Sequence, residues 1–118
     1  MQRQDQLVWD YAEFLQEFTA KNWNSAAQYL SADTKTGFGG EVGPDGLVQV
    51  FGSDDVCHSA MVQALGLGCR KTGEGDNMHC VSPPYLGPDI VYLGARASFQ
   101  YNVKNDRWML VYLICGGD

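Results

Sequence analysis

The chain has 118 residues, of which 45% are hydrophobic and 12% aromatic, a composition typical of one globular domain that can bury its own core. Its formal net charge of −6, from 14 acidic and 8 basic residues, argues against binding to nucleic acid or to an anionic membrane, because only Arg70 and Lys71 are adjacent and the other basic residues are scattered. No apolar stretch approaches the roughly 18 residues that a membrane span needs.

The start of the chain and its cysteines bear on the cellular compartment. Residues 1–6 carry charge but no apolar segment, so a cytoplasmic protein is the default expectation, and a mature chain whose export signal has been removed is the alternative. Cys57, Cys69, Cys80 and Cys115 include no C-x-x-C pair and are expected to be mainly buried, reduced thiols. Cys69 and Cys80 flank a glycine-containing segment and could face each other across a hairpin.

The first third of the chain predicts helices followed by a loop. Residues 5–20 have the apolar spacing of one helical face, formed by Leu7, Tyr11, Phe14, Leu15 and Phe18. Asn24 or Ser25 is expected to cap a second, shorter helix. Glycines are too frequent over residues 31–46 for a regular element, so a loop is predicted there, with a short strand near Phe38.

A short strand and a third helix are expected next. Residues 47–51 alternate between apolar and polar side chains as a strand does. Ser53 is expected to cap a helix whose first turn holds Asp54 and Asp55, and Gly66 and Gly68 are expected to end it.

The last forty or so residues predict a sheet. Strands are expected over residues 78–82, 89–103 and 107–115, with a turn at 104–106. Both faces of the last strand are apolar, which indicates an interior strand covered by helices on one side and by a second subunit on the other. The predicted fold is therefore a single α+β domain over residues 1–118, with N-terminal helices packed on a curved antiparallel sheet.

The order of these elements resembles the nuclear transport factor two-like superfamily, the cone-shaped fold of ketosteroid isomerases and polyketide cyclases. The segment FLQEFTAKNWNSAAQYLSAD, residues 14–33, is similar to the opening signature of that superfamily, and the last strand with Trp108 near its start fits its closing strand. An ungapped match places Phe14 where the isomerases hold an oxyanion with a Tyr, and Phe38 where they have a general-base Asp. Because neither side chain transfers a proton, the resemblance implies a fold without isomerase chemistry.

The same resemblance implies an apolar pocket inside the cone, which would bind an unidentified small molecule. The expected lining residues are Tyr11, Phe14, Phe38, His58, Phe99, Tyr101 and Trp108, with Arg96 on the more polar face of its strand. The alternative interpretation of Tyr11 is a core ring whose hydroxyl reaches a backbone partner. The alternative interpretation of Arg96 is a side chain that faces solvent. A homodimer through the sheet is the expected assembly.

Two other functions stay open. In a lyase or isomerase, Asp55 would orient His58 as general base and Tyr11 or Arg96 would hold a developing negative charge, although Asp55 and His58 also suit a solvated ion pair on a helix. In a protein-interaction module, the rings of Phe14, Phe18 and Phe99 would fill the cone. The spacing of the cysteines and histidines matches no known zinc pattern, so neither a metal nor a cofactor is expected.

Overall fold

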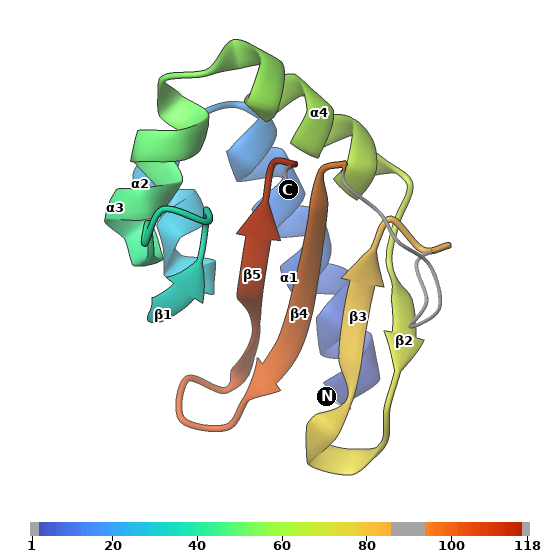
Figure 1. The fold of residues 1–118 in the computed structure, drawn as a ribbon. Coiled ribbons are helices and arrows are strands. Elements are labelled where there is room, and N and C mark those ends of the chain that lie inside the picture. Colours follow the sequence, from blue (N-terminus) through green and yellow to red (C-terminus); the bar gives the residue numbers. More distant parts are fainter. Residues whose placement is uncertain (1–2, 86–93, 117–118) are drawn as a thin grey trace.

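The computed structural model describes residues 3–85 and 94–116 and shows helices packed against a five-stranded mixed sheet (Figure 1). Its strands are β1 (Leu30–Lys35), β2 (Arg70–Thr72), β3 (His79–Ser82), β4 (Arg96–Asn102) and β5 (Arg107–Ile114). They lie in the order β1-β5-β4-β3-β2, so β5 is an interior strand, as its two apolar faces predicted. The predicted α+β class is confirmed, but only part of the sheet is antiparallel, because β1 pairs with β5 in parallel.

Helix α1 (Arg3–Thr19) follows the predicted stripe and buries Leu7, Phe14 and Phe18. It runs behind the sheet in Figure 1. A short helix α2 (Trp23–Ala26) and a 3-10 turn (Ala27–Tyr29) then lead into β1. The expected caps at Asn24 and Ser25 are wrong, because α2 begins at Trp23 and the preceding Asn22 side chain makes no capping hydrogen bond. Within the described ranges, no helix has the length and apolar character required to cross a membrane.

The predicted strand at residues 47–51 is helical in the structure. Helix α3 (Gly43–Leu47) continues into a π-helical turn (Val48–Gly52), and Leu47 and Phe51 are fully buried. Their i, i+4 spacing fits both a strand face and a helix face, so the alternation was ambiguous. The loop expected over residues 31–46 is likewise shorter than predicted, since β1 and α3 occupy both of its ends and no described strand lies at Phe38.

Helix α4 (Asp55–Gly66) lies close to its predicted bounds, but Asp54 rather than Ser53 is its cap. The Asp54 carboxylate accepts the amide N–H groups of Val56 and Cys57 at 3.0 and 3.1 Å. Gly68 follows the helix with a φ of +92°, a conformation that glycine adopts without steric cost.

The C-terminal strand predictions are confirmed where the structure describes them. β3 and β5 match the predicted strands, and the expected turn between β4 and β5 contains Asp106 with a φ of +51°. β4 begins at Arg96, and the earlier part of the predicted strand at residues 89–103 falls partly on residues 86–93, which lie outside the described residues.

All four cysteines form disulfides, which corrects the expectation of reduced thiols. Cys57 at the start of α4 is bonded to Cys115 after β5, and Cys69 is bonded to Cys80 in β3. The second pairing is the hairpin contact that the sequence allowed. The first joins residues 58 positions apart, and no local pattern indicates it, because the two cysteines approach only when α4 lies over the end of the sheet.

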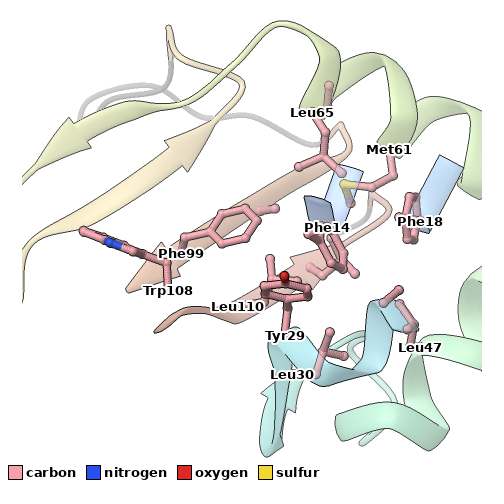
Figure 2. Close-up of a cluster of buried hydrophobic side chains, with 14 of the residues drawn as sticks. Phe14, Phe18, Tyr29, Leu30, Leu47, Met61, Leu65, Phe99, Trp108 and Leu110 are labelled. Atoms are coloured by element: carbon pink, nitrogen blue, oxygen red, sulfur yellow. The ribbon is translucent and has the colours of Figure 1, made fainter. Parts of the chain in front are cut away.

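A single aromatic core lies between α1, α4 and the sheet (Figure 2). Phe14 is at its centre, with ring centroids 5.5 Å from Phe18, 6.0 Å from Tyr29 and 5.8 Å from Phe99. Met61 and Leu65 cover it from α4. Because these side chains come from the beginning, middle and end of the chain, the core joins α1, α4 and the sheet.

Tyr29 is expected to make the free energy of unfolding depend on pH in the alkaline range. Burial, with a hydrogen bond to Glu13 as a further cause, raises the pKa of Tyr29 to about 12. The fold therefore favours the protonated phenol, and this stabilisation is complete below the unfolded pKa of about 10 and is lost as the pH rises through about 12. We expect the free energy of unfolding in urea to fall across this interval, and to fall less in Tyr29→Phe. Equal declines in both proteins would contradict the prediction.

Candidate functional site

The interior of the cone is filled by aromatic rings. Phe14, Phe18, Phe51 and Phe99 each have 0% of their surface exposed, so not even a water molecule touches them. Phe18 contacts Phe51 edge to face with centroids 5.3 Å apart, and Phe14 contacts Phe99 in the same way. Phe14 and Phe99, which were expected to line a pocket, pack against each other in the structure.

Tyr11 is a core ring with a backbone partner. Its hydroxyl donates to the carbonyl oxygen of Leu65 at 2.5 Å and lies 3.2 Å from Oγ of Ser82. Its ring centroid is 5.1 Å from that of Phe99. Burial raises the pKa of Tyr11, which keeps the phenol protonated and therefore able to donate. The hydroxyl thus ties α1 to the end of α4 and to β3.

His58 and Asp55 do not contact each other as a general-base pair would. His58 is buried, its Nε2 lies 2.7 Å from the carbonyl oxygen of Phe18, and its ring stacks near that of Phe18 with centroids 4.8 Å apart. Asp55 instead accepts a hydrogen bond from Lys21 at 2.9 Å, and this contact lowers the pKa of its exposed carboxyl. The imidazole therefore fastens α4 to α1, and the carboxylate faces solvent.

Trp108 and Tyr101 lie at the other end of the core, against the start of α1. The indole N–H of Trp108 donates to the carbonyl oxygen of Arg3 at 2.7 Å, and its backbone N–H donates to the Asp10 carboxylate at 2.8 Å. The Arg3 guanidinium lies 4.3 Å from the centre of the Tyr101 ring, and the Tyr101 hydroxyl bonds to Asp106. Burial raises the pKa of Asp10 despite the Trp108 contact. These contacts hold the first turns of α1 on the sheet.

Phe38 and Arg96 lie apart from the other candidate residues. Arg96 alternates with Ala97, which is fully buried on the helix side, so its side chain belongs to the opposite face of β4. The Phe38 ring, 50% exposed, lies 5.6 Å from the Arg96 guanidinium and 4.7 Å from Nζ of Lys35. The structure therefore separates the predicted pocket residues into a core group and a group on the outer face of the sheet.

This outer face holds features that the sequence interpretation missed. It is the face of β3, β4 and β5 turned away from α1 in Figure 1. A groove of about 220 Å³ lies along β1, β4 and β5. Ser31, Asp33, Thr34, Gln100, Tyr101, Asn102, Met109, Leu110 and Val111 line the groove. The sequence did not indicate Lys35 and Asp33 as candidate site residues, because β1 was not predicted. The only sequence signal was the isolated Leu30 before a polar segment, which is typical of an edge strand.

The described residues contain no group of three or more His, Cys, Asp or Glu side chains placed to hold a metal ion. All four cysteines are consumed in disulfides, so thiolate ligation is not available to them in this state. His58 directs Nε2 at a backbone carbonyl oxygen. The polar atoms of Tyr11 and His58 are thus bonded to the protein itself, whereas the buried Thr36 hydroxyl has no hydrogen-bond partner among the described residues.

Comparison with known proteins adds evidence on the fold. No family model matches the sequence, and no curated protein matches it. Among solved structures, the chain is similar to a nuclear transport factor two-like (NTF2-like) protein with a cystatin-like fold from Novosphingobium aromaticivorans, at 15% identity and a TM-score of 0.52, over 95% of this chain and 79% of that one. The resemblance predicted from the sequence is therefore confirmed at the level of the fold: this chain has a nuclear transport factor two-like, cystatin-like architecture.

Proposed function

We propose that this chain is a non-catalytic binding domain that acts through the outer face of its sheet and not through the interior of its cone. The observation that carries the proposal is the complete burial of Phe14, Phe18 and Phe99, which leaves no space for a small molecule among them. The interaction module with a ring-filled cone, one of the alternatives open from the sequence, is the function that fits this geometry.

The contacts of the candidate catalytic residues support the absence of an enzymatic reaction. A general base needs a substrate within hydrogen-bond reach, whereas the Nε2 atom of His58 is already bonded to the Phe18 carbonyl. Phe14 and Phe38, at the positions that correspond to the isomerase donor and base, have no ionisable group, and one of them lies in the core while the other lies on an exposed loop.

We further propose that the outer face pairs with a second copy of the chain. Met109 and Val111 are apolar residues that line the groove, and Val111 is 39% exposed in the centre of an interior strand. None of the described helices covers this side of β3, β4 and β5 in Figure 1. An apolar side chain in that position is typical of a surface that another protein covers.

Sedimentation at micromolar concentration tests this assembly. We expect a species of twice the 13.0 kDa chain mass, and we expect Val111→Glu to produce the monomer, because the dimer would bury a carboxylate without a partner. Val103→Glu is the matched control, since Val103 is 68% exposed in the turn between β4 and β5. A wild-type protein that sediments as a monomer would remove the support for a sheet-to-sheet interface.

The disulfides support an oxidising compartment as the place where the chain works. Disulfides that involve every cysteine persist in secreted and periplasmic proteins and are rare in the cytoplasm. The exported form that the sequence left open is therefore our proposal, in place of the cytoplasmic default.

A further inference from the structure

A compact cluster of two cations and an exposed aromatic ring lies at one end of the outer face. Lys35 comes from the end of β1, Arg96 from the start of β4, and Phe38 from the loop between β1 and α3. The ring of Phe38 lies 4.7 Å from Nζ of Lys35 and 5.6 Å from Cζ of Arg96, both within cation–π range. Between the two strands lies Tyr112 of β5, which is paired with both Lys35 and Ser98.

The loop that carries Phe38 has a defined shape. The backbone N–H of Thr36 donates to the carbonyl oxygen of Glu41 at 3.0 Å, and the N–H of Gly39 donates to the Glu41 carboxylate at 2.9 Å. Gly40, with a φ of +92°, supplies the backbone conformation that closes the turn. An exposed phenylalanine at the tip of a closed turn, held between two cations, indicates a contact surface rather than a core residue that failed to pack.

The two cations of this cluster have no carboxylate partner among the described residues. The ion pairs found there join Arg3 to Asp76 and Lys21 to Asp55. Arg96 donates one bond to the carbonyl oxygen of Gly94, which leaves most of its donors without a described partner. In a chain with a net charge of −6, two cations that share one ring and have no acidic partner among residues 3–85 and 94–116 mark a local site for an anion.

The groove lies along β1, β4 and β5 of the same sheet. Its lining includes Thr34, the chain neighbour of Lys35, and the apolar residues Met109 and Val111. Asp33 also lines the groove and would repel a second negative charge. A molecule bound at the cluster would therefore place its anionic group near Lys35 and Arg96 and an uncharged, apolar part over Phe38.

We propose that Lys35, Arg96 and Phe38 form a binding site for a carboxylate carried on an aromatic or other flat apolar group. Arg binds a carboxylate with two parallel hydrogen bonds, Lys adds a point charge, and the Phe38 ring provides the apolar contact. The carboxylate comes either from a free small molecule or from an acidic side chain of a bound protein, a second copy of the chain included. The site does not involve the cone interior and does not depend on the dimer proposed above.

Isothermal titration with phenylacetate, and with phenylacetamide as its uncharged isostere, tests the charge requirement. We expect phenylacetate to bind and phenylacetamide to bind at least about tenfold more weakly, because only the carboxylate forms charge-assisted hydrogen bonds. Lys35→Gln and Arg96→Gln should each weaken phenylacetate about tenfold. Lys104→Gln, in the exposed turn between β4 and β5, is the matched control and should bind like the wild type.

Phe38→Leu provides a second test at an exposed position where the fold is not at risk. Loss of the ring should weaken phenylacetate while a carboxylate without an aromatic group, such as acetate, is unaffected. The peptides Glu-Phe-Glu and Gln-Phe-Gln, blocked at both ends, distinguish the sources. Tighter binding of the acidic peptide than of phenylacetate, lost in Arg96→Gln, would assign the carboxylate to a protein, and the reverse order would assign it to a free small molecule. If neither acid binds, or if the neutral analogues bind equally well, the proposal is overturned.

Discussion

Replacing both Cys57 and Cys115 by serine is expected to lower the free energy of unfolding by about 4 kcal/mol, because the bond closes a loop between residues 58 positions apart and so restricts the unfolded chain. The bond also fixes the first turn of α4 against the end of β5. The same turn contains His58, which is bonded to the Phe18 carbonyl oxygen of α1. Urea unfolding under non-reducing conditions measures the difference.

The second disulfide supplies the matched comparison. Cys69 and Cys80 are only 11 positions apart, so the same loop-closure argument gives a loss of about 3 kcal/mol for the corresponding double serine variant. Dithiothreitol should destabilise the wild type by more than it destabilises either variant, and should leave a variant without any cysteine unchanged. Four titratable thiols in the purified, unreduced protein would show that neither bond forms.

The outcome also bears on where the protein works. Most domains are stabilised by only about 5–15 kcal/mol, so the loss of both bonds would remove a large part of that total. A chain that unfolds on reduction would not persist in a reducing cytoplasm. A chain that stays folded without its disulfides would remove the argument for an oxidising compartment while leaving the rest of the fold unaffected.

The sequence predicted the elements whose side chains repeat with one clear period. The stripe through Leu7, Phe14 and Phe18 identified α1, and the alternation around Trp108 identified β5, because burial on one face imposes the repeat directly. It misassigned residues 47–51, where Leu47 and Phe51 fit both periods. It missed β1, an irregular edge strand whose register with β5 shifts between Leu30 and Lys35.

The candidate site was less predictable than the fold because it depends on contacts between distant segments. His58 faces the core and not Asp55 because its imidazole forms a hydrogen bond with the Phe18 carbonyl oxygen of α1. Whether Phe38 enters the cone is decided by the closed turn at Glu41 and by cations on β1 and β4. Local periodicity contains no information about either choice. The candidate residues named from the sequence therefore do not form one site: some lie in the core and others lie on the outer face of the sheet.

Phe14→Ala should have the largest effect of any single core substitution that we propose. Phe14 is fully buried and contacts the rings of Phe18, Tyr29 and Phe99, so its removal is expected to cost about 3–5 kcal/mol in the free energy of unfolding and to leave an apolar cavity. Phe38→Ala, at a ring that is 50% exposed, is the matched control and should cost less than about 1 kcal/mol.

The same variant tests whether the aromatic rings fill the cone permanently or can separate to admit a ligand. Apolar cavities of this kind stay dry and accept benzene, so benzene should raise the melting temperature of Phe14→Ala if the variant remains folded. The wild type should show no such increase, because Phe14 already occupies the volume that the ligand would take. An increase of the same size in the wild type would mean that the rings separate readily, and the apolar pocket expected from the resemblance would then replace the outer face as the functional site. Without that increase, Phe14 fills in the wild type the volume that benzene occupies in the variant, which would support our proposal that this chain binds through its surface.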